Sequence, residues 1–174
     1  MPESNTPIKN LPDNDEVPLS VDINIQHDSE TNRYAEDSVL RIQKTTFSIL
    51  SDHDISRGSI SIAVVDDPTI RKLNNQYLQH DYETDVLSFV LEYKQETGYL
   101  EGEIIVSLDT AVRVAKEIGS TPADELLLYV VHGTLHLVGF GDKDEADREE
   151  MRQAEQKYML AAGAQYHAPT EDQA

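Results

Sequence analysis

The sequence contains no cysteine and little positive charge, and it lacks long hydrophobic runs. The absence of cysteine excludes a disulfide scaffold, an iron–sulfur cluster and a zinc site with cysteine ligands. No apolar run approaches about 20 residues, so no transmembrane helix is predicted. Residues 1–18 have neither a basic start nor an apolar stretch, which is unlike a secretory signal. We therefore expect a cytoplasmic protein with no membrane association.

Acidic side chains dominate the charge of the chain. There are 33 Asp and Glu residues against 14 Lys and Arg, which gives a formal net charge of -19. Such a chain gains no long-range attraction to phosphates, which argues against a sequence-blind coat protein for nucleic acid and against a DNA partner. An enzyme that acts on nucleic acid through a metal or a local basic patch stays possible. Arg113, Lys116 and Lys143 are candidates for such a patch.

The length of 174 residues suits one ordinary domain with a core of its own. Residues 1–18 carry Pro, Asn and Asp with few apolar side chains, and we expect them to form a flexible acidic tail. We place a single domain at 19–163 and a loose tail at 164–174. No internal repeat is present.

Hydrophobic spacing predicts an alternation of strands and helices. Alternating apolar residues predict strands near 21–25, 60–64, 86–92 and 103–108, with a turn containing Gly98 and Gly102 before the last. Helical spacing predicts helices near 35–51, after 67, and over 109–118, 121–138 and 144–162, with Asp67, Asp109, Thr121 and Asp144 as N-caps. This order predicts the α+β class, as one domain with a small mixed four-stranded sheet packed on helices.

Two histidines stand on the most apolar of these helices. His132 and His136 are four residues apart, so both rings leave the same helix face. Gly139 allows the chain to reverse after the helix, and Asp142 is the next side chain that can turn back toward the rings. Two imidazoles and a carboxylate predict a zinc site with one open coordination position, which is the catalytic arrangement.

Two other interpretations of the histidine pair deserve comparison. A histidine on an apolar helix face can be an ordinary core residue that is hydrogen-bonded within the protein. A zinc protease would carry the spacing H-E-x-x-H, with the glutamate as general base. Gly133 stands at that position, so a metalloprotease would lack its base.

Three ordered segments resemble the YbeY endoribonuclease family. VVHGTLHLVGFGD is similar to the family signature H-G-x-L-H-L-x-G-[YF]-D-H, NNQYLQHDYETDVLSF to N-x-x-[YF]-R-x-x-D-x-P-T-D-V-L-S-F, and GEIIVSLDTA to G-[DE]-I-x-I-S-x-x-x-A. The closing helix EEMRQAEQKYML resembles the family pattern M-x-x-x-E. The resemblance implies an endoribonuclease with one Zn²⁺ per chain that acts on single-stranded RNA. Its implied roles are maturation of ribosomal RNA, including the 16S 3′ end, and ribosome quality control.

The chain departs from the family pattern at two positions that bear on chemistry. The third metal ligand of the family is a histidine, and Asp142 stands there. A carboxylate ligand lowers the net positive charge of a zinc site, so bound water is acidified less and phosphate is attracted less. The family arginine implicated in RNA cleavage is replaced by Leu78, which cannot bind a phosphate. His80, if protonated, is a partial substitute, although it is equally an ordinary loop histidine.

The general base stays open at this point, with a zinc-bound hydroxide or Asp85 as candidates. Asp85 can also hold a ligand histidine in place, or simply belong to a turn. The alternative to an enzyme is a ribosome-associated binding module with a structural zinc, which Leu78 and the acidic charge favour.

Overall fold

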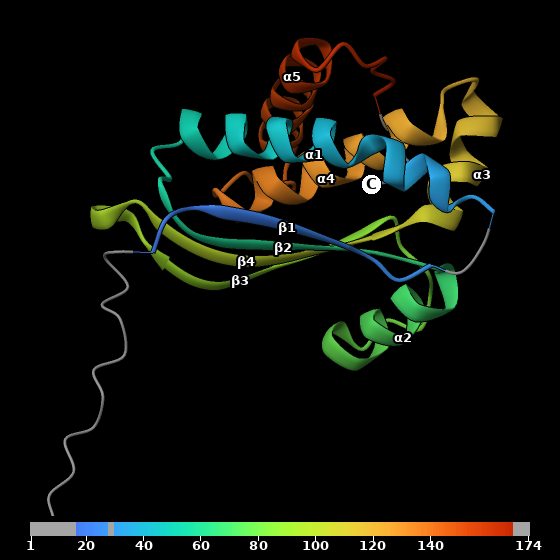
Figure 1. The fold of residues 1–174 in the computed structure, drawn as a ribbon, viewed down its shortest axis with the longest axis horizontal. Helices are drawn as coiled ribbons and strands as arrows, with labels where there is room; N and C mark the ends of the chain where they lie inside the picture. Colours follow the sequence, from blue (N-terminus) through green and yellow to red (C-terminus); the bar gives the residue numbers. More distant parts are fainter. Residues whose placement is uncertain (1–16, 28–29, 169–174) are drawn as a thin grey trace, which may run out of the picture.

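The computed structural model describes residues 17–27 and 30–168 (Figure 1). Residues 1–16 and 169–174, which include most of the two predicted tails, lie outside the described residues. The elements in chain order are β1 (Ser20–Ile25), α1 (Asn32–Asp52), β2 (Arg57–Val65), α2 (Asp67–Leu78), β3 (Val86–Lys94), the short 3₁₀ helix η2 (Gln95–Thr97), β4 (Tyr99–Ser107), α3 (Leu108–Ile118), α4 (Pro122–Leu137) and α5 (Glu145–Ala161).

The four strands form one mixed sheet with the order β1-β2-β4-β3. β1 pairs with β2, and β2 with β4, in parallel, while β3 and β4 are antiparallel. This follows from the connections, because α1 and α2 lie in the crossovers, whereas only η2 and Gly98 separate β3 from β4. The predicted α+β class and small mixed sheet are confirmed.

Helices cover the two faces of the sheet unequally. Figure 1 shows α1, α3, α4 and α5 on one face and α2 alone on the other. α4 packs on β3 and β4 and is flanked by α1, α3 and α5, so nearly all of its sides are buried, and Leu126, Leu127 and Leu135 have no exposed surface. This enclosure explains why the helix is apolar all round. The α2 face has a small core of its own, formed by Val65, Ile70, Leu87 and Ile105.

Two glycines let α4 approach the sheet closely. A Cβ atom on Gly133 would lie 2.9 Å from Ile104 Cγ2, and one on Gly102 would lie 2.8 Å from Leu137 Cδ1. Gly102 therefore lies inside β4 rather than in the predicted turn, and its role is to make room for a helix side chain. The turn itself is made at Gly98, where φ is +62°.

Two of the four predicted helix caps are wrong by one or two residues. Asp66, not Asp67, caps α2 by accepting a hydrogen bond from Thr69 N at 2.9 Å, and Ser107, not Asp109, caps α3. Asp109 instead accepts from Asp67 N at 3.0 Å, and this bond joins the starts of the two helices. Thr121 and Asp144 cap α4 and α5 as predicted.

The last described residues return to the core without regular structure. Ala164 is buried, and the Tyr166 hydroxyl donates a hydrogen bond to Glu155 Oε2 at 2.9 Å. Residues 164–166 thus help to cover α5. Within the described ranges, no helix combines the length and apolar character needed to cross a membrane.

Candidate metal centre

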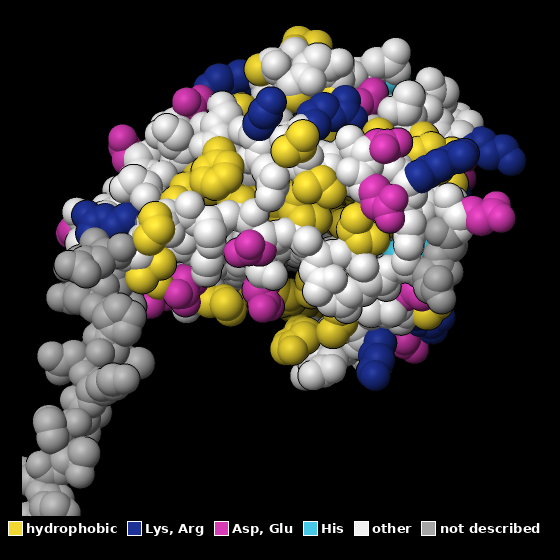
Figure 2. All heavy atoms as spheres, viewed as in Figure 1, with side chains coloured by type: hydrophobic (Ala, Val, Ile, Leu, Met, Phe, Trp, Pro, Cys, Tyr) yellow, Lys and Arg dark blue, Asp and Glu magenta, His cyan; other side chains and the backbone are white. Residues whose placement is uncertain are grey.

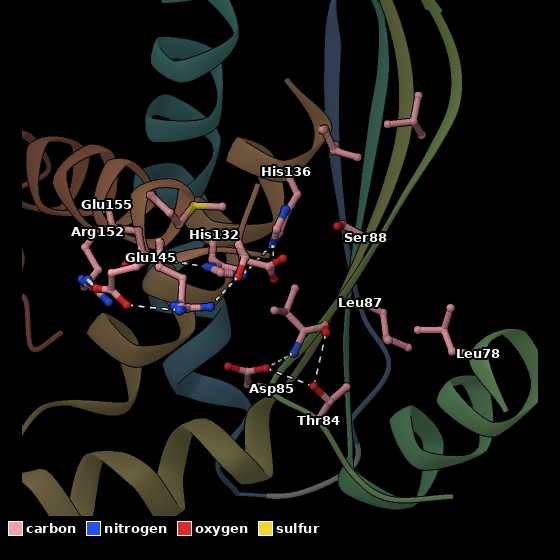
Figure 3. Close-up of a pocket in the computed structure, with 16 residues that line it drawn as sticks. Leu78, Thr84, Asp85, Leu87, Ser88, His132, His136, Glu145, Arg152 and Glu155 are labelled. Carbon is pink, nitrogen blue, oxygen red and sulfur yellow. Dashed lines mark hydrogen bonds and ion pairs between the residues drawn. The ribbon is translucent and has the colours of Figure 1, made fainter. Parts of the chain in front are cut away.

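A cleft of about 910 Å³ opens where the end of α4 meets β3 and α5 (Figure 3). One wall comes from the α4–α5 side and the other from α2, β3 and the segment before it. The residues that line it are Leu78, Thr84, Asp85, Val86, Leu87, Ser88, Val90, His132, His136, Leu137, Asp142, Glu145, Arg148, Met151, Arg152 and Glu155. The predicted histidines, Asp142 and Asp85 therefore share one cavity.

The two histidines of α4 face each other across one helical turn. Their Nε2 atoms are 2.9 Å apart, and the ring planes are nearly perpendicular, at 81°. The Nδ1 atom of His132 lies 2.7 Å from Glu155 Oε1, and that of His136 lies 2.9 Å from the carbonyl oxygen of Phe140. The orientation of each ring is thus fixed by a hydrogen bond at Nδ1, the nitrogen that faces away from the other histidine.

These contacts determine where the ring protons lie. A carboxylate and a carbonyl oxygen only accept hydrogen bonds, so each Nδ1 carries the proton and each neutral Nε2 presents a lone pair. Two lone pairs at 2.9 Å repel unless a positive charge, either a proton or a metal ion, lies between them. The donor set therefore fits a cation, because neutral imidazoles with the hydrogen on the far nitrogen are the form that binds metals.

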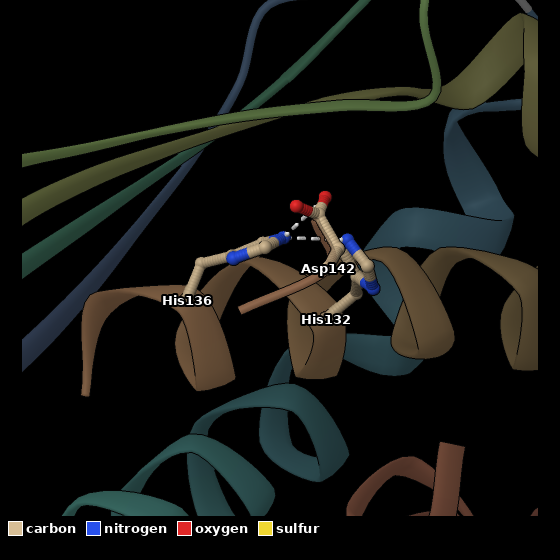
Figure 4. A group of neighbouring side chains, drawn as sticks. All are labelled: His132, His136 and Asp142. Carbon is tan, nitrogen blue, oxygen red and sulfur yellow. Dashed lines mark hydrogen bonds and ion pairs between the residues drawn. The ribbon is translucent and has the colours of Figure 1, made fainter. Parts of the chain in front are cut away.

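Asp142 completes a group of three donors (Figure 4). Its Oδ2 atom lies 3.5 Å from His136 Nε2, and one donor atom from each of the three residues lies within 4.8 Å of the others. Donors around tetrahedral zinc, at about 2.0–2.1 Å from the ion, are roughly 3.3 Å apart. Gly139 adopts a φ of +104°, which turns the chain back so that the carboxylate reaches the rings. The three residues can hold a metal ion.

Burial and neighbouring charges act differently on the two rings. Burial is the largest influence on His132 and lowers its pKa, but the hydrogen bond and charge of Glu155, together with more distant carboxylates, outweigh it and leave the pKa above 6.5. Burial and the neighbouring His132 hold the pKa of His136 below 6.5. His136 is therefore neutral at pH 7, ready to offer its lone pair.

Glu155 is a part of the site that the interpretation of the sequence missed. Its side chain is 2% exposed, and it accepts hydrogen bonds from both His132 and Tyr166. We predicted that Asp85 can hold a ligand histidine, but Glu155 makes that contact. The available signal was the α5 stripe, in which Glu155 follows Met151 by four residues and precedes Tyr158 by three.

The remaining predicted site residues divide between the cleft and the surface. Asp85 lines the cleft, where its Oδ1 atom accepts from Val86 N at 2.8 Å and from the Thr84 hydroxyl at 3.1 Å. His80 is exposed, stacks on the Tyr82 ring at 5.3 Å and is not among the lining residues. Leu78 does line the cleft, so the position of the family arginine faces this cavity.

Basic residues enter the cleft from α5 only. Arg148 and Arg152 are the two Lys or Arg side chains among the described residues that line it, whereas Arg113, Lys116 and Lys143 do not line it. Elsewhere, on the face of the molecule in Figure 2, Lys and Arg side chains are scattered among acidic and uncharged ones. The three residues proposed for a local patch are thus absent from the lining of this cleft, and its two arginines belong to the last helix.

The structure also explains why glycine stands between the histidines. Gly133 faces Ile104 and Val86 of the sheet, at distances that a Cβ atom could not adopt without a shift. A glutamate at this position would point into the sheet and away from the cleft. The protease arrangement is therefore incompatible with the packing of α4.

Comparisons with known proteins agree with one another. A family model described as endoribonuclease YbeY matches residues 22–163. A protein with that name from Rhodopirellula baltica is 47% identical over 109 residues, which cover 62% of this chain and 55% of the relative. One from Salinibacter ruber is 37% identical over 140 residues, or 77% of this chain and 83% of the relative. The solution structure of TM1509 from Thermotoga maritima is similar in fold, with a TM-score of 0.55 and 24% identity over 82% of this chain and 88% of that chain.

Proposed function

The chain belongs to the YbeY endoribonuclease family, and on that premise we propose that it is a zinc-dependent endoribonuclease for single-stranded RNA. The substrate we propose is precursor ribosomal RNA, including its 16S 3′ end. We further propose that the protein acts in the cytoplasm and takes part in ribosome quality control. One Zn²⁺ per chain is held by His132, His136 and Asp142. The observation that carries the proposal is the pair of Nε2 atoms at 2.9 Å, each with its lone pair directed by a fixed Nδ1 contact.

The chemistry divides between the metal and the chain. When bound, a divalent ion supplies a Lewis acid that polarises a phosphodiester oxygen. Glu155 and the Phe140 carbonyl keep both rings in the metal-binding tautomer without rearrangement. The open face of the donor group is turned to the cleft, where a phosphodiester has room to enter.

Asp85 is the side chain that we propose as general base. It lines the same cleft, and its Oδ1 atom is held by the Val86 N–H and the Thr84 hydroxyl, which fixes the carboxylate in position. Held in this way, it can accept a proton from an attacking oxygen. His80, which we considered for phosphate binding or catalysis, is a weaker candidate because it lies on the surface loop outside the cleft lining.

Metal analysis and RNA cleavage test the proposal together. The pure wild-type protein is expected to hold one equivalent of zinc and to cleave a single-stranded RNA, while His132→Ala and His136→Ala lose both properties. Asp85→Asn should retain zinc and lose most of the cleavage. A full zinc equivalent in His132→Ala would overturn the site, and equal cleavage by wild type and His136→Ala would indicate a contaminating nuclease.

A ribosome-associated binding module with a structural zinc is the second candidate. Leu78 favours it, because a leucine in the cleft wall cannot clamp the phosphate that is to be cleaved. In that case zinc-loaded wild type would bind ribosomal RNA or ribosomes without cleaving them. Binding without turnover, under conditions where zinc occupancy is complete, would select this candidate over the enzyme.

A further inference from the structure

The two arginines of α5 occupy the cleft wall opposite Leu78. Figure 3 shows Arg152 and Glu145 on the α5 side of the histidines, with Leu78 on the other side. The rest of that wall, from β3 and the segment before it, contributes no Lys or Arg side chain among the described residues. The only Lys or Arg side chains that the described part of the chain offers to a ligand in this cleft are therefore Arg148 and Arg152.

Arg148 is also the arginine next to the metal centre. Its Nη1 atom donates to the carbonyl oxygens of Asp142 and Lys143, both at 3.3 Å, while Nη2 donates to Glu145 at 3.1 Å. A phosphate that reaches the open side of the donor group would pass this guanidinium. Arg152 follows one helical turn later, about 6 Å farther along the same rim.

The present partners of these arginines are exchangeable. Glu145 accepts from both guanidiniums, at 3.1 and 2.8 Å, and its side chain is 71% exposed. Glu149, the other partner of Arg152, is 56% exposed. Exposed ion pairs within one helix contribute little free energy, whereas a guanidinium can bind a phosphate with two charge-assisted hydrogen bonds. The arginines can therefore exchange a carboxylate for a phosphate.

The charges in the cleft indicate when such an exchange is favourable. Four carboxylates, those of Asp85, Asp142, Glu145 and Glu155, line the cleft together with the two guanidiniums. Without a metal the formal charge is negative and repels RNA, and a divalent cation brings it to neutrality. Phosphate binding by the arginines is thus coupled to occupation of the metal site.

We propose that Arg148 and Arg152 form a phosphate-binding subsite for consecutive phosphates of a single-stranded RNA. In this chain they take the place of the arginine that Leu78 replaces. The inference rests on the proposed function, since it assumes that RNA enters this cleft. Glu145 then acts as a competing anion that occupies the subsite until RNA displaces it.

Arg152→Ala and Glu145→Gln test the subsite in opposite directions. The affinity of the zinc-loaded protein for a short fluorescent single-stranded RNA is measured by anisotropy at several salt concentrations, with RNA integrity checked on a gel. Arg152→Ala should weaken binding roughly tenfold and reduce the slope of log Kd against log salt by about 0.7. Glu145→Gln removes the carboxylate that both guanidiniums share, while Arg152 keeps its pair with Glu149, and it should strengthen binding by several fold.

Matched controls separate the subsite from general charge effects. Arg71→Ala removes an exposed arginine of α2 that pairs with Asp81, and Glu150→Gln removes an acid of α5 that does not line the cleft. Neither should change Kd more than about twofold. Arg148→Lys keeps the charge but loses the fork, so it should weaken RNA binding while zinc content stays complete.

Equal effects of Arg152→Ala and Arg71→Ala, or an unchanged affinity in Glu145→Gln, would overturn the subsite. Cleavage is scored separately from binding. A wild type that cleaves RNA while Arg152→Ala binds normally leaves the proposed enzyme intact and removes the subsite. A wild type that never cleaves, with binding still lost in Arg152→Ala, removes the enzyme and keeps the subsite.

Discussion

At the scale of single residues, Glu155 connects the last helix to the metal centre. It is buried, and it accepts hydrogen bonds from His132 Nδ1 at 2.7 Å and from the Tyr166 hydroxyl at 2.9 Å. A carboxylate in this place fixes the orientation of the ring and makes the Nε2 lone pair a better ligand for a metal ion. Its effect on a metal held by the three donors would therefore be indirect, through His132.

Glu155→Gln is expected to weaken zinc binding about 10- to 100-fold. The glutamine carbonyl can still accept from Nδ1, but it adds no negative charge to support the ring. Competition with a chromogenic chelator measures the zinc affinity. Glu149→Gln, on the exposed side of the same helix, is the control. If the two variants bind zinc equally well, Glu155 has no role in the site.

Residue chemistry explains which site residues could be predicted. The spacing of His132, His136 and Asp142 follows from helix geometry and a glycine turn, both of which are local in sequence. Glu155 is 23 residues from His132, and its partnership depends on how α5 packs on α4. The position of Arg148 and Arg152 in the cleft was not predicted for the same reason. A charge-rich helix start indicates a solvent-exposed segment, and only the tertiary structure shows that a cleft lies beside it.

At the scale of elements, the contact between α4 and β4 brings the helix that carries the two candidate histidine ligands close to the sheet. Gly133 lies against Ile104, and Gly102 lies against Leu137, so each element supplies one glycine to the interface. The histidines occupy the neighbouring face of the same helix turn. A change in the spacing between α4 and β4 would therefore move the rings relative to Asp85.

Gly133→Ala separates packing from helix propensity, because the two predict opposite signs. Propensity alone favours alanine in a helix interior by about 1 kcal/mol. The added Cβ would lie 2.9 Å from Ile104 Cγ2 and 3.2 Å from Val86 Cγ2, and we expect this overpacking to destabilise the protein by about 1–3 kcal/mol.

Urea unfolding monitored by circular dichroism measures the effect of Gly133→Ala. Ser48→Ala on the exposed face of α1 is the control, and it should be neutral or slightly stabilising. A Gly133→Ala variant that is more stable than wild type would contradict the close contact between α4 and β4.

Element boundaries show where local patterns are insufficient. The four strands and five α-helices were expected near their observed positions, although β4 begins at Tyr99, four residues before the predicted start, and η2 was not predicted. The errors lie at Asp67 and Asp109, whose side chains bond to other elements, and at Gly102, where the lack of a side chain makes room for Leu137 of α4. Asp109, for example, accepts from Asp67 N and pairs with His27 at 2.9 Å, a residue 82 positions away. Such long-range partners leave no signal in a short sequence window.

At the scale of the whole molecule, the three candidate metal ligands come from two parts of the chain that differ in burial. His132 and His136 belong to the buried helix α4, while Asp142 is exposed on the segment that leads to α5. A bound ion would tie this segment to α4. Because the unfolded chain does not hold the three donors together, metal binding adds directly to the stability of the folded state.

Removal of zinc should therefore lower the melting temperature of the wild type. Zinc at about 100 times its Kd stabilises a single-site protein by about 2.7 kcal/mol, and for a chain of this size each kcal/mol corresponds to roughly 2–4 °C. We expect the wild type to melt about 5–10 °C lower after treatment with a chelator, as measured by differential scanning calorimetry, and to recover when zinc is added back.

His136→Ala should melt at one temperature with or without chelator, because only His132 and Asp142 remain as donors. Asp142→Ala should show an intermediate response, since two imidazoles still face each other at 2.9 Å in the buried part of the site. A wild type that holds zinc but melts at the same temperature with and without chelator would mean that the ion does not bridge the two segments.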